Sequence, residues 1–344
     1  MKIENIEIGP NFPPFIIAEM SGNHNQSLER ALAIVDAAAQ AGAHAIKLQT
    51  YTPETITIKG AYTIKDENSL WYNRELYELY QEAYTPWEWH EPIFKRAKEK
   101  GLIAFSSPFD ETAVDFLETL NVPAYKIASF ENTDHLLLKK VASTGKPVIM
   151  STGVATITDI DEAVNILRKN DCKDIILLKC TSTYPATPQN TNLLTIPHMR
   201  ELFNCQVGLS DHTLGIGVAI ASVVLGACVI EKHLTLNRED GGVDSAFSIE
   251  PEELKALVIE SERAFLALGK ILYGILPVEE KNLKFKRSLY VVKNVIAGEI
   301  FTAKNVQSKR PAIGLHTKYF DFVLGKKAKV SIKIGTPLTF NLIE

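Results

Sequence analysis

Two short stretches of the sequence each end an apolar run on a histidine. GLSDHT, residues 208–213, carries His212, and VIEKHLT, residues 229–235, carries His233. Imidazole nitrogens are good ligands for divalent transition metals, and a site with only two of them stays open for substrate and water. The sequence therefore predicts that these histidines share one metal ion. The alternative is that both rings are hydrogen-bonded structural groups.

Two lysines lie inside otherwise apolar runs, Lys47 in IKLQ and Lys126 in YKIAS. A buried ammonium is costly without a partner, so each lysine indicates an anionic ligand, a carboxylate partner or Schiff-base chemistry. Hydroxyls at the ends of neighbouring runs favour a bound phosphate or carboxylate over an imine; they belong to Ser129, Ser151 and Ser210. The alternative is a structural salt bridge to Glu19 or Glu131.

Acidic residues accompany these groups. Glu19 ends the apolar stretch FIIAE, where burial would raise the pKa of its carboxyl toward the range of a general acid or base. It could equally neutralise Lys47. Asp211 and Glu231, beside the two histidines, either orient the imidazole rings or form ion pairs. His24, in a predicted loop, is expected to contact substrate rather than metal.

All these residues follow or end short β-branched runs that alternate with amphipathic helical patterns. The runs are 15–20, 45–51, 102–109, 124–129, 147–153, 174–182, 205–211 and 228–235. Strands that alternate with helices predict a parallel sheet, and eight such units predict a closed (β/α)8 TIM barrel, completed by a helix near 251–268. Active sites of this fold lie at the C-terminal ends of the strands, where the candidate residues gather. A doubly wound open sheet is the alternative.

The chain is expected to contain two folded parts. Residues 1–270 form the predicted barrel, 271–284 read as a linker with Gly, Pro and charge, and 285–344 hold short β runs broken by Gly and Pro turns. So short a segment buries little core alone, so we expect it to dock on a barrel, its own or that of a neighbour.

Composition excludes several classes of partner. The 344 residues carry a formal net charge of −4, so no basic field suggests nucleic acid or a membrane surface. No apolar run is long enough to span a bilayer, and the N-terminus is not a secretory signal. The four cysteines show no CxxC pairing and are predicted to be buried thiols in a reducing cytoplasm, ahead of zinc ligands or disulfides. The aromatic run 71–90 is attributed mainly to helix packing, with sugar stacking as the alternative.

In their order along the chain, the motifs resemble the sialic acid synthase family, whose members condense phosphoenolpyruvate with a sugar to make nonulosonic acids. The motifs are IAEMSGNHNQS, IKLQTY, SSPFD, YKIAS, STG, CTSTYP, GLSDHT and IEKHLT, and the tail AGEIFTAKNVQSKRP resembles the family's antifreeze-like (SAF) domain. MSGNHNQS most resembles the pseudaminic acid synthases, which implies 2,4-diacetamido-2,4,6-trideoxy-L-altrose as acceptor. Two differences argue against N-acetylmannosamine as the acceptor. Sialic acid synthases commonly carry Asn where this chain has Ser182, and the sugar-contacting Asn of those relatives has no counterpart near residues 70–75.

The resemblance implies a role for each candidate residue. His212 and His233 would hold Mn²⁺, with Mg²⁺ or Co²⁺ possible. Phosphoenolpyruvate would be bound by Lys47, Lys126, Ser129, Ser151, Ser182 and Ser210. The amino-sugar would contact Glu19, Gln49, Tyr184, Asp244, Phe285 and Arg310. Glu19 is the first choice for the proton carrier, with Glu131 and Asp244 as alternates. Arg310 would reach the partner subunit's barrel in a domain-swapped homodimer.

Three other functions compete with this interpretation. A Schiff-base pyruvate aldolase would use Lys126 as nucleophile, and a sibling enzyme would be an N-acetylneuraminate or legionaminate synthase. A metal-free sugar-binding or ice-binding module would fit the tail. However, passive binding does not require two histidines, a buried carboxylate and several lysines at one barrel mouth.

Overall fold

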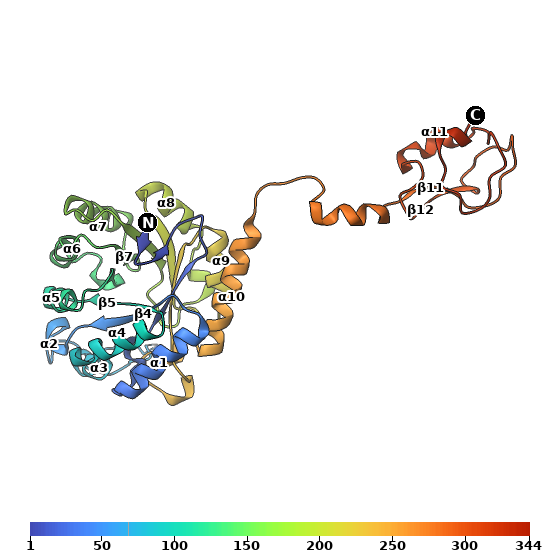
Figure 1. Ribbon diagram of the computed structural model, residues 1–344. Helices are drawn as coiled ribbons and strands as arrows, with labels where there is room; N and C mark the ends of the chain where they lie inside the picture. The colour runs from blue at the N-terminus through green and yellow to red at the C-terminus, as the bar shows by residue number, and fades with distance from the viewer. Residues whose placement is uncertain (68) are drawn as a thin grey trace. The chain divides into compact units, whose positions relative to one another are not determined.

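Eight parallel strands close into a barrel in the order β10, β3, β4, β5, β6, β7, β8, β9 (Figure 1). Their bounds are β3 Phe15–Glu19, β4 Ala45–Thr50, β5 Ile103–Pro108, β6 Tyr125–Ile127, β7 Val148–Ser151, β8 Ile175–Cys180, β9 Gln206–Asp211 and β10 Val229–His233. Each strand lies inside the run predicted for it, which confirms the TIM-barrel prediction. The computed structural model describes residues 1–67 and 69–344 and divides into two units, Met1–Gly269 and Lys270–Glu344.

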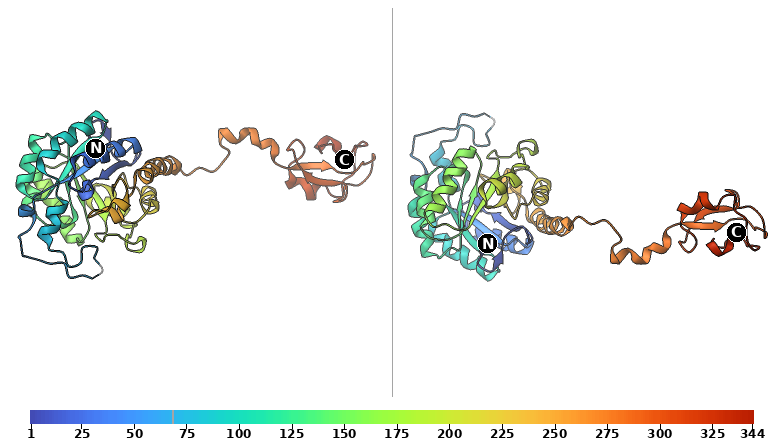
Figure 2. Two further views of the ribbon diagram at one scale, coloured as in Figure 1. Left: turned by 90° about the horizontal axis from the view of Figure 1, so that it is seen from below. Right: turned by 90° about the horizontal axis from the view of Figure 1, so that it is seen from above.

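Helices follow the strands and surround the barrel, as the two turned views in Figure 2 show. They are α1 Leu28–Ala41, α2 Pro53–Ile56, α3 Leu76–Ala83, α4 His90–Glu99, α5 Glu111–Thr119, α6 His135–Ala142, α7 Ile157–Lys169, α8 Thr195–Phe203, α9 Gly217–Val224 and α10 Pro251–Leu268. The expected helix near 251–268 is thus present as α10.

Local sequence signals set where these helices begin and end. Ser27 caps α1 by accepting a hydrogen bond from the Arg30 backbone N–H, and Gly42 ends it in the left-handed conformation at a φ of 85°. The Thr156 and Asp159 side chains form a capping box at the start of α7. The caps at Ser27 and Thr156 fix where two loops of the barrel mouth end, whereas Gly42 belongs to the opposite rim.

The core fills the barrel wall and the layer between strands and helices. Side chains alternate along a strand, so Ile46 and Leu48 of β4 face the helices while Lys47 faces the interior. All three are buried. Burial of aliphatic side chains against the helices stabilises the scaffold by about 1.5–3 kcal/mol for each large residue, and this rigid layer holds the polar groups in the mouth.

The second unit has its own small core and little regular structure. A 3₁₀ helix, η7 Pro277–Phe285, precedes β11 Ser288–Val291, which pairs antiparallel with β12 Val306–Lys309. The short helix α11 Phe320–Val323 packs its Val323 into a cluster with Leu289 and Phe301. An antiparallel pair, β1 Lys2–Ile3 and β2 Ile6–Glu7, begins the first unit.

In the part of the chain that the structure describes, no helix combines the length and apolar character needed to cross a membrane. The four thiols, Cys172, Cys180, Cys205 and Cys228, are all free and buried, as predicted.

Candidate active site

Strand register places the key residues at one level of the barrel mouth. His233 at the end of β10 pairs with Glu19 at the end of β3, and Glu19 pairs in turn with Lys47 on β4. On the other side of β10, Glu231 pairs with Ser210 of β9. The residues therefore meet because eight parallel strands end at the same rim.

Four buried charged side chains form a chain of ion pairs inside the mouth. The Lys47 ammonium lies 2.6 Å from Glu19 Oε2 and 3.8 Å from Glu231 Oε1. Lys126 Nζ lies 3.4 Å from the same Glu231 oxygen. Salt bridges thus accompany both lysines, but the carboxylate shared between them is Glu231 rather than Glu19 or Glu131.

The pKa values of these groups reflect competition between burial and charge. Burial raises the pKa of Glu19 above its ordinary value although Lys47 opposes the shift. Burial also acts on Glu231, but Lys126 and Lys47 outweigh it and lower the pKa of this carboxyl. Burial lowers the pKa of the Lys126 ammonium. Two cations and one firmly ionised carboxylate therefore share a water-poor space that can accept a further anion.

Serine hydroxyls form a cradle beside Lys126. A Cβ on Gly153 would lie 2.1 Å from Ser182 Oγ and 2.6 Å from Ser129 Oγ, so a glycine is required for these hydroxyls to converge. The Gly153 backbone N–H donates to Ser129 Oγ at 3.2 Å. Ser151 Oγ is buried and has no hydrogen-bond partner within residues 1–67 and 69–344. Hydroxyls and a backbone amide grouped in this way suit a phosphate or carboxylate.

The two predicted metal-binding histidines face each other. Their ring centroids are 5.3 Å apart, close enough for one ion to contact a nitrogen of each ring at about 2 Å. His212 Nδ1 lies 3.0 Å from the Thr181 carbonyl, so it carries the proton and leaves Nε2 as a lone pair. His233 Nδ1 is buried and has no hydrogen-bond partner in the described chain, and burial lowers the pKa of His233 far below its usual value.

These features fit a divalent transition metal. Neutral imidazole is the form that binds metal. Burial favours this form in both rings, but contact with Cys180 outweighs burial at His212 and raises the pKa of that ring. Across the described residues, no three His, Cys, Asp or Glu side chains are arranged as a complete metal site. The pair would supply two ligands and leave the remaining positions to substrate and water.

A cysteine thiol also contacts the pair. Cys180 Sγ lies 3.9 Å from His212 Nδ1 and 3.7 Å from Ser182 Oγ. Burial alone would raise the pKa of this thiol, but the neighbouring His212 outweighs burial and lowers it to about 6. The sequence motif CTSTYP contained this residue, yet a lone cysteine in an apolar strand gave no sign of the contact.

A second polar cluster adjoins Glu19. Gln49 Nε2 donates to Glu19 Oε1 at 2.9 Å and to Ser21 Oγ at 3.1 Å. The Ser21 hydroxyl donates to Asp244 Oδ2, which lies 4.0 Å from His233 Nδ1. Burial raises the pKa of Asp244. Gln49 and Asp244 thus reach the mouth as predicted, while Ser21 was missed because it lies beyond the strand in a turn.

The third candidate acid, Glu131, lies in the 3₁₀ helix η3 Ser129–Glu131. Burial raises its pKa to about 7, and Lys126 opposes the shift. One oxygen, Oε2, is buried without a hydrogen-bond partner among the residues described. A carboxyl that titrates near neutral pH is suited to exchange protons with a substrate.

Aromatic rings line another wall of the mouth. Tyr184 packs 4.5 Å from the His212 ring and 5.1 Å from Phe247, and Phe247 packs 5.0 Å from His233. Trp71 contacts Tyr184 with ring centroids 5.8 Å apart. Tyr184 was predicted, and Trp71 begins the aromatic run 71–90, which was attributed mainly to helix packing with sugar stacking as the alternative. Phe247 was not singled out, because only the tertiary fold brings its loop beside the histidines.

Other candidate residues lie elsewhere. Asp211 is paired with Lys232 at 2.8 Å, so it forms an ion pair of its own. His24 is buried, with Nε2 3.1 Å from Thr85 Oγ1, and packs within the fold. Phe285 and Arg310 are exposed residues of the second unit, and their roles stay predictions.

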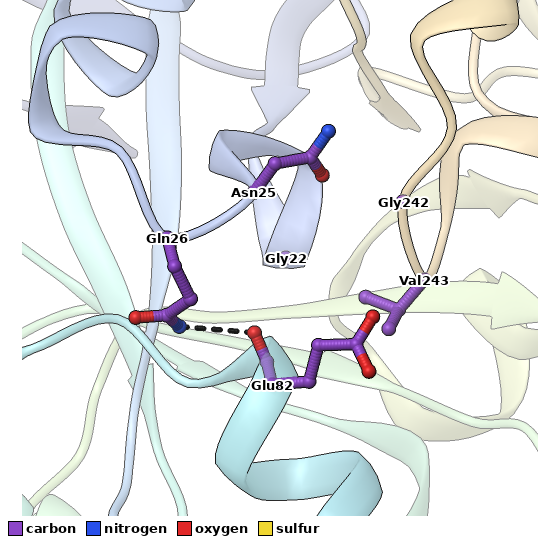
Figure 3. Close-up of a pocket in the computed structure, with 6 residues that line it drawn as sticks. All are labelled: Gly22, Asn25, Gln26, Glu82, Gly242 and Val243. Carbon is purple, nitrogen blue, oxygen red and sulfur yellow. Dashed lines mark hydrogen bonds between the residues drawn. The ribbon is translucent and has the colours of Figure 1, made fainter.

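A separate cavity of about 350 Å³ lies where the turn after β3, the end of α3 and the loop after β10 meet (Figure 3). It is lined by Gly22, Asn25, Gln26, Glu82, Gly242 and Val243. Gln26 Nε2 donates to the Glu82 carbonyl at 2.9 Å and to that of Tyr84 at 2.7 Å. Its polar amide is therefore already satisfied, and none of the six lining residues belongs to the chain of ion pairs or to the histidine pair.

Comparison with known proteins identifies the family of this chain. Residues 34–273 match the NeuB family model and residues 286–344 match the SAF domain model. The chain is 46% identical over 330 residues to a pseudaminic acid synthase of Campylobacter jejuni, covering 94% of this chain and 95% of the relative. It is 44% identical over 336 residues to a pseudaminic acid synthase of Helicobacter pylori, covering 96% and 98%.

A solved structure agrees with both the sequence relatives and the barrel. The N-acetylneuraminic acid synthetase of Leptospira borgpetersenii, in complex with citrate, superposes with a TM-score of 0.73 at 34% identity, covering 82% of this chain and 94% of that one. The resemblance to the sialic acid synthases is confirmed: the chain belongs to the NeuB family and carries a C-terminal SAF domain.

Proposed function

We propose that this chain makes pseudaminic acid. It condenses phosphoenolpyruvate with 2,4-diacetamido-2,4,6-trideoxy-β-L-altropyranose and water, and releases inorganic phosphate. One observation carries the proposal: the anion cradle, the imidazole pair and three carboxyls whose pKa values are raised share one barrel mouth. The chain that holds this site is 44–46% identical to pseudaminic acid synthases over more than nine tenths of its length.

Phosphoenolpyruvate binds to the lysines and the serine cradle. Lys126 and Lys47 neutralise the phosphate and carboxylate charges without acting as nucleophiles. Ser129, Ser182 and the unpartnered Ser151 hydroxyl donate to the anionic oxygens. The sharing of Glu231 between the two ammonium groups supports this role, because its negative charge favours the charged form of both lysines against the effect of burial.

The imidazole pair holds the metal, Mn²⁺ in the proposal, with Mg²⁺ or Co²⁺ as alternatives. When bound there, the cation supplies Lewis-acid polarisation of the acceptor's aldehyde oxygen. The protein's contribution is orientation: the Thr181 carbonyl fixes the His212 ring, and Phe247 packs against His233.

Carbon–carbon bond formation then requires a proton at the aldehyde oxygen and a water at C2 of the donor. C3 of the enol phosphate attacks the aldehyde carbon, water adds at the cationic C2, and the resulting tetrahedral hemiketal phosphate expels phosphate with C–O cleavage. Glu19 is the first choice for the proton carrier, because burial raises its pKa toward the range of a general acid or base and Gln49 donates to its Oε1. Asp244 and Glu131 are the alternates.

The acceptor contacts Gln49, Tyr184 and Asp244 in the same mouth. In the proposal, two copies of the chain form a domain-swapped homodimer in which Arg310 and Phe285 complete the acceptor site of the partner subunit. Exposed apolar side chains of the segment before β11, such as Ile271 at 92% and Tyr273 at 95% exposure, support an association of this kind. A cytoplasmic location is supported by the four free thiols.

A phosphate-release assay tests the proposal. The chain, phosphoenolpyruvate and Mn²⁺ are combined separately with the proposed altrose, with 2,4-diacetamido-2,4,6-trideoxy-D-mannose and with N-acetylmannosamine. The proposed acceptor should give at least about tenfold higher kcat/KM than either of the others. Preference for the second or third sugar would identify a legionaminate or N-acetylneuraminate synthase instead.

Two further measurements address the mechanism. In ¹⁸O-labelled water, the label should enter C2 of the product and not the released phosphate, because the C–O bond of the donor breaks. Borohydride with pyruvate should trap no adduct. A covalent adduct at Lys126 would support the Schiff-base aldolase in place of the synthase.

A further inference from the structure

Trp71 connects three separate loops at the barrel mouth. It lies in the segment between α2 and α3, and its indole Nε1 donates to the Val243 carbonyl in the loop after β10 at 3.0 Å. Its ring contacts Tyr184, in the loop after β8, at 5.8 Å between centroids. The side chain is only partly buried, so one part of a large apolar surface remains available at the rim.

The carbonyl that Trp71 holds belongs to the residue before Asp244. This loop is packed tightly: a Cβ on Gly22 would lie 2.4 Å from Val243 Cγ2, and the adjacent Ser21 hydroxyl donates to Asp244. Figure 3 shows Gly22 and Val243 in this arrangement. Trp71 therefore contacts Tyr184 through its ring, and through its N–H it holds the backbone beside Asp244.

The mouth thus has two chemically different walls. Gln49, Ser21 and Asp244 form a hydrogen-bonded wall, whereas Phe247, Tyr184 and Trp71 form an aromatic wall that leads away from the imidazole pair. A sugar whose aldehyde carbon lies at the histidines can direct hydroxyl and amide groups to the first wall. Its apolar C–H face and far end then lie against the second.

We propose that Trp71 determines specificity at the far end of the acceptor, by packing against an apolar C6 methyl group and disfavouring a C6 hydroxymethyl group. This inference rests on the proposed function, because it assumes that the acceptor's aldehyde lies at His212 and His233. Trp71 is the outermost of the three rings in the chain of contacts, two contacts from His212. It is therefore the ring suited to the end of the sugar most distant from the reacting carbon.

The expected discrimination is moderate. An apolar pocket rejects an added hydroxyl by about 100-fold at most, because the hydroxyl loses water without gaining a partner. The test compares the proposed acceptor with 2,4-diacetamido-2,4-dideoxy-L-altrose, the same sugar with a hydroxyl on C6. The chain should favour the C6-methyl sugar by about 10- to 100-fold in kcat/KM.

Three variants separate the ring from its hydrogen bond. Trp71→Leu removes the ring and should reduce the preference to about threefold or less, while the KM for phosphoenolpyruvate changes by less than about twofold. Trp71→Phe keeps an aromatic surface but loses the N–H, so the preference should survive. The matched control is Trp87→Phe, which loses an equivalent indole bond to the Tyr51 carbonyl, at 3.2 Å. Its preference should equal that of the unmodified chain.

The outcomes distinguish the two proposals. A preference that persists in Trp71→Leu, or an unmodified chain that accepts both sugars equally, overturns the role of Trp71 and leaves the proposed function intact. Lack of turnover with both sugars in the unmodified chain overturns the proposed function and, with it, this inference. Collapse of the preference in Trp71→Leu, with retention in Trp71→Phe and Trp87→Phe, supports it.

Discussion

Lys47 and Glu19 form a buried ion pair across neighbouring strands, with ammonium and carboxylate 2.6 Å apart and both side chains almost fully shielded from solvent. Burial raises the pKa of the Glu19 carboxyl, and the Lys47 ammonium opposes this rise while the pair persists. An incoming phosphate would compete for Lys47 and release Glu19. In the proposed function, donor binding and proton transfer would thereby be linked through one lysine, which gives the arrangement a testable energetic signature.

Replacing Lys47 with Met should destabilise the protein by about 3–5 kcal/mol at pH 8, because Glu19 and Glu231 lose a shared counter-ion in a buried site. The double variant Lys47→Met with Glu19→Gln should recover part of this loss. Urea unfolding of the two single variants and the double variant measures the coupling. Strictly additive effects would mean that the pair contributes no interaction energy.

Replacing His233 with Ala should abolish tight Mn²⁺ binding, since one of the two proposed ligands is lost. Electron paramagnetic resonance of free Mn²⁺ measures binding without turnover. The control, His198→Ala, alters an exposed histidine of α8 and should bind as the unmodified chain does. Exhaustive EDTA treatment should also remove activity, and added Mn²⁺ should restore it. Full activity after chelation would contradict the metal assignment.

Much of this architecture was predictable because its physical causes are local. The eight strands are short β-branched runs separated by capped amphipathic helices, a pattern that leads to a barrel. Lysines inside apolar strands indicated charged partners. Side chains alternate between the two faces of β10. Glu231 and His233 therefore face the mouth, whereas Lys232 faces away and pairs with Asp211.

Contacts across the barrel and between loops were not predictable in this way. Glu231 bridges Lys47 and Lys126 from different strands, and no spacing in the sequence specifies which side chains meet across the interior. Trp71 and Val243 are joined by a hydrogen bond between loops distant in sequence. Such contacts depend on loop conformation, which the hydrophobic pattern does not encode.

Glu131 should make stability depend on pH. Burial raises its pKa from 4.5 to about 7. Between these values the folded state keeps a proton that the unfolded state has lost, so this residue's contribution makes stability fall as pH rises through the window. Glu131→Gln should remove that penalty and raise stability at pH 8, relative to the unmodified chain, by about 2 kcal/mol after discounting for solvent screening.

Unfolding in urea at pH 4.5 and pH 8 tests this sign. The difference in the free energy of unfolding between Glu131→Gln and the unmodified chain should be larger at pH 8 than at pH 4.5. The exposed Glu88 supplies a control, Glu88→Gln, whose difference should stay nearly constant. A larger stabilisation by Glu131→Gln at low pH would show that the carboxyl is favoured in its charged form.

Arg310→Ala should raise the KM for the sugar far more than the KM for phosphoenolpyruvate, if this arginine completes the acceptor site of a partner subunit. A guanidinium donates hydrogen bonds to carbonyl oxygens such as those of acetamido groups. The mass of the variant in solution should remain that of the unmodified chain. Equal increases in both KM values would argue against a sugar-facing arginine.

Gly153→Ala offers the most direct test of the anion cradle. The added Cβ would lie 2.1 Å from Ser182 Oγ and 2.6 Å from Ser129 Oγ, so both hydroxyls must turn away from the space they share. Serine side chains rotate readily, so the barrel should fold while the KM for phosphoenolpyruvate rises by about 10- to 100-fold, the cost of one or two lost charge-assisted hydrogen bonds. Gly217→Ala is the matched control, because its Cβ would meet nothing within 4 Å in the described chain. If both variants bound phosphoenolpyruvate equally well, the donor would have to lie elsewhere in the mouth, away from Ser129 and Ser182.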